Sequence, residues 1–220
     1  MEKYFGRLPE PAGVIPPLGQ EEPLQQGERR VEVVFDAEPR LVLAYHKPGH
    51  PDPDHAVFAV LQSLLSDGRS SLLHRRLIQE KHLAISEFAA EMPGELYPSL
   101  LVLGATPRRV VSNERVLAEI VDVVRDLQNR FLPEAEVAAA KKRLRTQMLQ
   151  DLSSNYGLAR FLARGGLLFG RFETQLDFYL STDAVTALDI QRVARRYLVP
   201  ENRTIVMLRK SEKGKRAWHE

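Results

Sequence analysis

The six histidines are the side chains in this sequence best suited to binding a metal ion, and they are His46, His50, His55, His74, His82 and His219. No two of them have the His-x-x-x-His spacing that places two imidazoles on one face of a helix. The segment His50–His55 also carries two aspartates and could bind a metal adventitiously, but a rigid turn before a helix is the simpler interpretation. We therefore predict that no residue of this chain is a metal ligand.

The sequence also lacks the motifs of a catalytic nucleophile and of a phosphate-binding loop. The sequence has no cysteine, which excludes thiolate zinc sites, iron–sulfur clusters and cysteine nucleophiles. No Gly-x-Ser-x-Gly motif is present, and Ser70 and Ser71 are expected to cap the start of a helix. The glycine-rich stretch Arg164–Gly170 lacks the Gly-Lys-Ser/Thr ending of a phosphate loop, so a helix break or close packing is expected there. We predict no catalytic residue in this chain.

The overall charge gives no support to a nucleic-acid partner. Lysine and arginine number 31 against 29 aspartates and glutamates, a net charge of +2. Two basic runs, Lys141–Arg145 and Arg192–Arg196, are most simply solvated helix faces. No stretch of about 18 apolar residues is present, so we expect no membrane span. A chain without cysteine suits both the cytoplasm and the periplasm of a bacterium, and these are the expected compartments.

The chain divides into three parts by composition. Residues 1–28 hold five of the 14 prolines, which favours an extended linker over helix or interior strand. Because such a linker stands at the start, we expect the sequence to be a piece of a longer protein. Residues 29–210 have regular patterns and form the expected domain, and residues 211–220 form a charged tail.

The regular patterns predict strands and helices that position everything else. Short runs rich in β-branched and other apolar residues predict strands at Arg30–Asp36, Arg40–His46, Ala84–Glu91, Leu101–Ala105 and Thr204–Leu208. Helical spacing of apolar residues predicts helices from Asp54 (as N-cap) to Asp67, from Ser70 or Ser71 to Ile78, and at Asn113–Phe131, Pro133–Leu152, Tyr156–Leu168 and Thr186–Leu198. The order predicts an α+β, two-layer sandwich, with an antiparallel or mixed sheet of about five strands and helices on one face.

One segment, Leu65–Ser86, resembles a pattern of the pitrilysin/insulinase-type zinc peptidases, which include the mitochondrial processing peptidase. In that pattern a glycine-rich turn precedes Ser-Ser-Arg-Leu, a helix ends in Leu-Arg-Glu-Lys, and Gly-Leu-Ala-Tyr-Ser leads into a strand. Further similarities are Tyr4-Phe-Gly6 with the proline-rich run after it, the Asp52–Asp54 loop, and the ending Ala194–Val206. The resemblance extends from Tyr4 to Leu208.

The resemblance implies a fold and a division of labour. In the family, two α+β halves of about this length close around an unfolded peptide, and the first half carries His-x-x-Glu-His, two zinc-binding histidines and a water-activating glutamate. This sequence has no such motif, so it resembles the second, non-catalytic half. The expected partners are a catalytic half, in the same polypeptide or a separate subunit, and a peptide substrate; zinc is expected in the partner half and no cofactor in this chain.

The resemblance also implies two substrate-contact positions. Active relatives place an arginine and a tyrosine where this sequence has Gln79 and Ile85. Glutamine keeps a hydrogen-bond donor without the charge, and isoleucine has no hydroxyl, although Arg75 or Arg76 could substitute from a helix turn away. Ile85 could instead fill the sheet core. Two functions remain open: the substrate-enclosing half of a zinc-dependent endopeptidase, and an inactive scaffold or interaction domain that has lost peptidase function.

Overall fold

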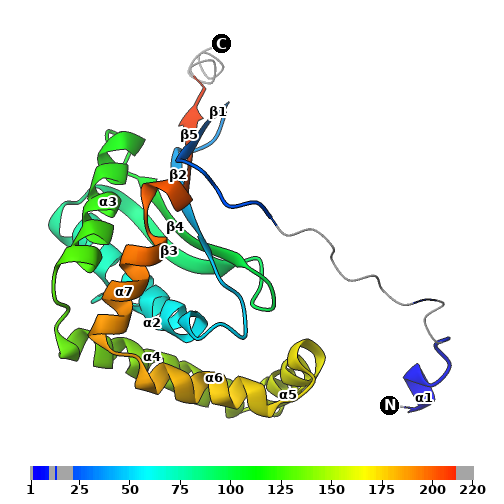
Figure 1. Ribbon diagram of the computed structural model, residues 1–220. Helices are drawn as coiled ribbons and strands as arrows, with labels where there is room; N and C mark the ends of the chain where they lie inside the picture. The colour runs from blue at the N-terminus through cyan, green and yellow to red at the C-terminus, as the bar shows by residue number, and fades with distance from the viewer. Residues whose placement is uncertain (1, 10–12, 14–21, 212–220) are drawn as a thin grey trace.

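The structure of the chain, a computed structural model, describes residues 2–9, 13 and 22–211. A five-stranded sheet forms one layer, and helices cover one of its faces (Figure 1). This arrangement confirms the predicted α+β sandwich with a mixed sheet.

The sheet has the spatial order β1-β5-β2-β4-β3. Its strands are β1 (Arg29–Phe35), β2 (Arg40–Lys47), β3 (Ala84–Met92), β4 (Ser99–Pro107) and β5 (Arg203–Lys210). Strand β1 runs parallel to β5, whereas the other neighbouring pairs are antiparallel. The last strand in the sequence, β5, therefore lies inside the sheet, between the first two strands in the sequence, β1 and β2.

Alternation along the strands separates a core face from an open face. In β2, Leu41, Leu43 and Tyr45 are fully buried, and the residues between them are partly exposed. Leu103 of β4 pairs with Leu43 and continues the core face. Side chains two apart along a strand point to the same side, so this pattern fixes which face the helices cover.

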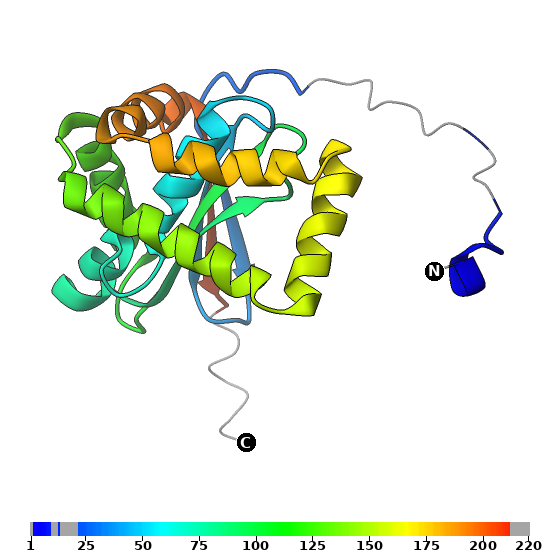
Figure 2. The ribbon, with the colours of Figure 1, turned by 90° about the horizontal axis from the view of Figure 1, so that it is seen from below.

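The helical layer is built around α2 (Asp54–Ser66), most of which is buried. The remaining helices are α1 (Glu2–Phe5), α3 (Asn113–Asn129), α4 (Glu134–Leu152), α5 (Asn155–Phe169), α6 (Glu173–Ala184), α7 (Ala187–Tyr197), the π-helix η1 (His74–Glu80) and the 3-10 helix η2 (Pro200–Asn202). Figure 2 shows α4 and α6 lying across the domain beneath the sheet. Helix α2 contacts β3 on one side and α4, α6 and α7 on the other. This central position explains why α2 is apolar around nearly its whole circumference.

Two local predictions are wrong, and three helices were not predicted: α6 and the short α1 and η2. Asp54 is the first residue of α2 rather than its N-cap, and the Asp52 carboxylate accepts the Asp54 N–H at 2.8 Å. The predicted short helix is present directly after Ser71 and takes the wider π form from His74, but the serines do not cap it: the Ser71 hydroxyl has no hydrogen-bond partner among the described residues, and the Ser70 hydroxyl accepts from Arg143. Helix α6 could not be predicted from the sequence because its apolar residues do not form one buried stripe. Two of them, Leu176 and Leu180, are exposed.

The predicted domain boundaries at 28 and 211 stay predictions. Residues before β1 already contact the sheet, since Gln25 donates to the Arg203 carbonyl at 2.8 Å and Glu28 forms an ion pair with the Arg203 guanidinium. Most of the predicted tail, residues 212–220, lies outside the described residues. Within the described part of the chain, no helix is long and apolar enough to cross a membrane.

Candidate functional site

The structure brings Gln79 and Ile85 to the same place, the junction between η1 and the start of β3. Both side chains are exposed, Ile85 to 66%. The Gln79 side-chain amide donates to the Arg69 carbonyl at 3.1 Å, and this is the contact that holds it in place. The two positions singled out by the resemblance thus lie on an accessible surface.

The backbone at this junction has an uncommon geometry. The Lys81 N–H donates to the Arg76 carbonyl at 3.1 Å, five residues back, and the Leu83 N–H donates to the Leu77 carbonyl at 2.8 Å. Between them, His82 has a φ of 53°, in the left-handed region. The zinc-peptidase pattern has a glycine at this position, the residue that adopts this conformation without steric cost.

A β-bulge then points Ile85 toward solvent. Ala84 pairs with Pro107 and Ser86 with Thr106, so Ile85 is the extra residue on β3. Bulges re-aim side chains in this way and recur next to functional sites. The alternative that Ile85 fills the sheet core is therefore wrong.

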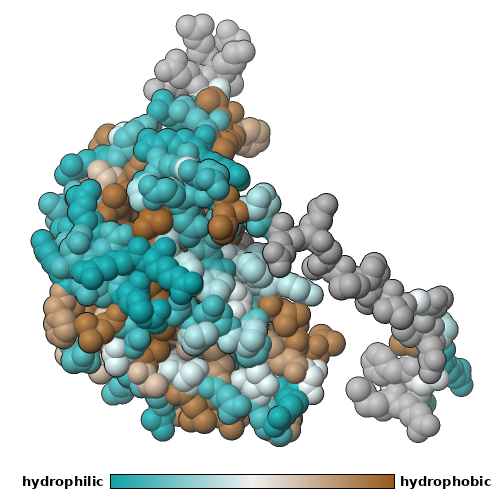
Figure 3. Space-filling model, in the orientation of Figure 1, coloured by the Kyte–Doolittle hydropathy of each residue, from teal (hydrophilic) through white to brown (hydrophobic). Residues whose placement is uncertain are grey.

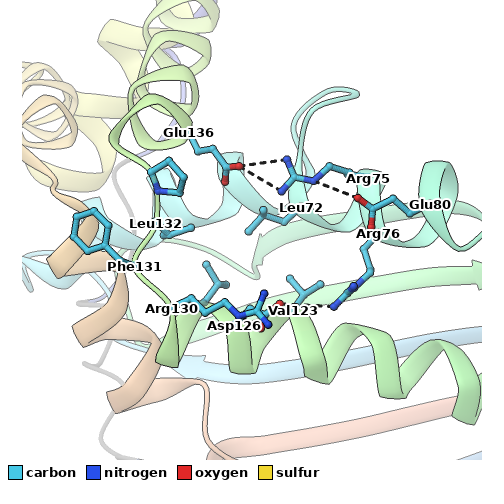
Figure 4. Close-up of a pocket in the computed structure, with 12 residues that line it drawn as sticks. Leu72, Arg75, Arg76, Glu80, Val123, Asp126, Arg130, Phe131, Leu132 and Glu136 are labelled. Carbon is cyan, nitrogen blue, oxygen red and sulfur yellow. Dashed lines mark hydrogen bonds and ion pairs between the residues drawn. The ribbon is translucent and has the colours of Figure 1, made fainter.

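Neither Arg75 nor Arg76 is a free substitute for the missing family arginine. Arg75 contacts Glu136 at 3.3 Å and Glu80 at 3.9 Å, whereas the Arg76 guanidinium contacts the buried Glu119 at 3.3 Å. Both line a cavity of about 320 Å³ between η1, the end of α3 and the start of α4 (Figure 4). Because their charges are already neutralised by carboxylates, these arginines contribute mainly to joining η1 to the helical layer.

The open face of the sheet carries an apolar row that crosses all five strands. Its members, in register from one edge to the other, are Val31, Val206, Val42, Gly104 and Phe88. Val31 and Phe88, at the two edges, are 48% and 43% exposed. Figure 1 labels helices α2 to α7 on the other side of the sheet, and Figure 2 shows this helical layer in front of the strands. A continuous apolar surface of this kind is typical of an interface.

The helical side of the molecule carries many hydrophilic residues (Figure 3). Figure 3 shows hydrophilic residues across much of this side, with hydrophobic ones at its lower edge, where Figure 1 places α5 and α6. Leu167 and Leu180 are exposed there, to 85% and 60%.

A buried charged cluster joins β2, β3 and the start of α2. The Lys47 ammonium lies 2.6 Å from the Glu91 carboxylate and donates to Nδ1 of His55 at 3.0 Å. Burial, followed by the Lys47 charge, lowers the pKa of His55 to about 4, and burial raises the pKa of Glu91. Sequence reasoning noted His55 but not its partners, because Lys47 and Glu91 are far apart in the chain and each sits in an ordinary strand pattern.

The five described histidines do not assemble a metal site, and His219 lies outside the described residues. Among the described residues, no group of three histidine, aspartate or glutamate side chains is placed to hold a metal ion. In the His50–His55 segment, Asp52 accepts a backbone N–H, Asp54 binds Arg192 at 2.7 Å, and His55 accepts from Lys47. Each of these three polar side chains has a structural partner, as the rigid-turn interpretation predicts.

The fold defines a class of protein: an α+β sandwich in which helices cover one face of a mixed five-stranded sheet. A family profile described as "Peptidase M16 inactive domain" matches residues 1–144, and the chain belongs to this family. This match confirms the predicted relationship to the pitrilysin-like zinc metallopeptidases. The chain is the inactive peptidase domain found in zinc protease-like proteins.

Individual relatives support the assignment. The chain is 27% identical over 204 residues to a Helicobacter pylori protein named "Zinc protease PqqE", covering 89% of this chain and 44% of that protein. The crystal structure of a protease from Helicobacter pylori superposes with a TM-score of 0.86 at 25% identity, covering 94% of this chain and 50% of the other. A peptidase M16 inactive domain from Pseudomonas fluorescens shares the fold, with a TM-score of 0.74 at 18% identity and coverage of 87% and 45%. The chain thus spans about half the length of these relatives.

Proposed function

We propose that this chain is the non-catalytic, substrate-enclosing half of a zinc-dependent endopeptidase. It pairs with a half that carries His-x-x-Glu-His and helps to hold an extended peptide between them. The observation that carries the proposal is the open sheet face, whose apolar row gives a second half a surface to cover. The lengths of the relatives, about twice that of this chain, also support the presence of another half.

In this proposal the chemistry belongs to the other half. A zinc ion there would lower the pKa of a bound water and polarise the peptide carbonyl. This chain contributes enclosure and orientation, which matter because a displacement of about 1 Å in a bound substrate can cost roughly a hundredfold in rate. Gln79 and Ile85 are the residues expected to contact the peptide, the first through its amide and the second through apolar contact.

A second candidate function is an inactive scaffold or interaction domain. The observation that favours it is the state of the two family positions. The Gln79 amide is already bonded to the Arg69 carbonyl, and Ile85 has no polar atom to offer a substrate. A scaffold would still need the open sheet face for its partner, so pairing alone does not separate the two functions, whereas cleavage does.

The test compares the purified chain with the same chain co-expressed with a His-x-x-Glu-His half. Alone, the chain should lose all zinc on dialysis and should not cleave an unfolded protein such as fluorescently labelled casein. The pair should form a stable complex with chelator-sensitive cleavage. Stoichiometric zinc or cleavage with the chain alone would contradict the proposal, and a stable complex without cleavage would favour the scaffold.

A matched pair of variants tests the pairing surface. Val31→Lys places a charge on the apolar row, whereas Leu188→Lys places the same charge on α7, where Leu188 is 64% exposed. The first should weaken the complex in sedimentation or size-exclusion experiments, and the second should not. Equal effects of the two substitutions would show that the open face is not the interface.

A further inference from the structure

The η1–β3 junction carries a group of exposed, positively charged side chains. Arg69, Lys81, Arg108 and Arg109 are all exposed. In the described part of the chain, none of the four side chains forms an ion pair or a hydrogen bond. We call these four residues the basic group.

Backbone contacts place the basic group around the substrate-contact positions. The Arg69 carbonyl accepts the Gln79 amide, and Lys81 follows η1 directly. The Arg108 N–H donates to the Leu83 carbonyl at 2.9 Å, and Arg108 follows the strand residue that pairs with Ala84. The four residues therefore come from three separate segments that meet beside the bulged strand.

Among the described residues, no carboxylate forms an ion pair with this group, and the nearest half-buried one in sequence is Asp67, two residues before Arg69. The adjacent arginines of η1, Arg75 and Arg76, are both engaged by carboxylates. The exposed carboxylate closest in sequence, Glu80, already contacts Arg75 at 3.9 Å. In a chain whose net charge is only +2, four unpaired cations at one junction form a local excess of positive charge.

Two exposed apolar side chains lie near these cations in the chain. Ile85 is 66% exposed, and Val110, which follows Arg109, is 95% exposed. Guanidinium groups bind carboxylates through two parallel hydrogen bonds, so three arginines beside exposed apolar side chains suit a segment that mixes acidic and apolar residues.

We infer that this junction binds acidic side chains of the extended peptide, so that the substrates held by this chain carry glutamate or aspartate in the segment that contacts it. The inference rests on the proposed function and deepens it by naming the substrate class. Its basis is charge complementarity: the junction supplies cations that have no partner among the described residues, and an acidic peptide supplies anions for them.

Binding of three end-blocked peptides to the full chain tests the inference. The peptides have equal length and identical apolar residues, and they differ only in carrying glutamate, glutamine or lysine at the same positions. By fluorescence anisotropy at low ionic strength, the glutamate peptide should bind roughly tenfold more tightly than the glutamine peptide, since each exposed ion pair adds a modest factor. The lysine peptide should bind most weakly, and added salt should remove the differences.

Charge reversal with a matched control locates the site. Arg108→Glu with Arg109→Glu should abolish the preference for the glutamate peptide. Lys142→Glu with Arg145→Glu makes the same change in charge on exposed positions of α4 and should preserve the preference. Melting curves check that both variants fold, and the salt dependence of the unmodified chain gives a measurement that needs no variant.

The outcomes separate this inference from the proposed function. Tight binding of all three peptides without a charge preference would overturn the acidic-substrate inference and leave peptide holding intact. Equal loss of preference in both double variants would overturn the location of the site. If none of the peptides binds, both the inference and the peptide-holding role fail.

Discussion

Lowering the pH should destabilise this domain through His55 before most carboxylates are protonated. In the folded chain, His55 is buried and its Nδ1 accepts a hydrogen bond from Lys47, so protonation would place two cations 3.0 Å apart. Its pKa is therefore lowered from 6.5 to about 4. Between these two values the unfolded chain binds a proton that the folded chain does not, so the free energy of unfolding falls as the pH falls.

The size of the effect follows from the two pKa values. Proton uptake by the unfolded state lowers the free energy of unfolding by about 2 kcal/mol at a pH near 5 and by about 3 kcal/mol below 4, relative to neutral pH. For a domain of this size, 2 kcal/mol corresponds to a decrease of roughly 4–8 °C in melting temperature.

The assay compares urea unfolding of the unmodified chain and of His55→Gln at neutral pH and near pH 5. Glutamine keeps an acceptor for Lys47 but does not titrate, so the variant should lose about 2 kcal/mol less than the unmodified chain over this interval. Glu91, whose raised pKa acts in the opposite direction, is present in both proteins and cancels to first order in the difference. Identical pH dependence of the two proteins would refute the reasoning, because it would mean that His55 titrates alike in the folded and unfolded states.

Three other variants have expected outcomes. Gly104→Ala should lower the free energy of unfolding in urea by about 1–3 kcal/mol, because the new Cβ would lie 2.1 Å from the Phe88 ring. An unchanged free energy of unfolding would show that the ring moves aside without cost. The double variant Gln79→Arg with Ile85→Tyr should change the free energy of unfolding by less than about 0.5 kcal/mol, because both positions are exposed. A clear drop in its melting temperature would mean that the bulge cannot accept the larger side chain. Asp54→Ala should lower the free energy of unfolding by about 1–3 kcal/mol, because the buried carboxylate binds arginine and tyrosine side chains of α7. An unchanged melting temperature would show that water replaces these bonds.

Much of the fold could be predicted from the sequence because local patterns and tertiary packing agree there. Buried and partly exposed residues alternate along β2 and most of β5, and α3 and α7 have clear apolar stripes. Helix α6 could not be predicted because packing against α2 and α5 holds it in place, and its own residues carry no matching stripe. The pairing of β1 with β5 is likewise invisible to local patterns.

The site was predicted less completely. Gln79 and Ile85 were found through a sequence pattern, but the bulge that exposes Ile85 depends on the register between β3 and β4. The unpaired state of Arg108 and Arg109 depends on which carboxylates lie nearby in space. Sequence spacing shows neither the strand register nor the nearby carboxylates. The positions could therefore be named from the sequence, but their exposure and their ion pairing could not be predicted from it.

The placement of β5 has a consequence for biosynthesis. Strand β5 inserts between β1 and β2, and Arg29 pairs with Thr204 across almost the whole domain sequence. Until the ribosome has released β5, β1 has no described neighbour, and the sheet consists of β2, β4 and β3 alone. Contacts of such large sequence separation form late and slowly. The apolar β1 must therefore stay unpaired through most of translation, which makes the nascent chain a natural client for chaperones.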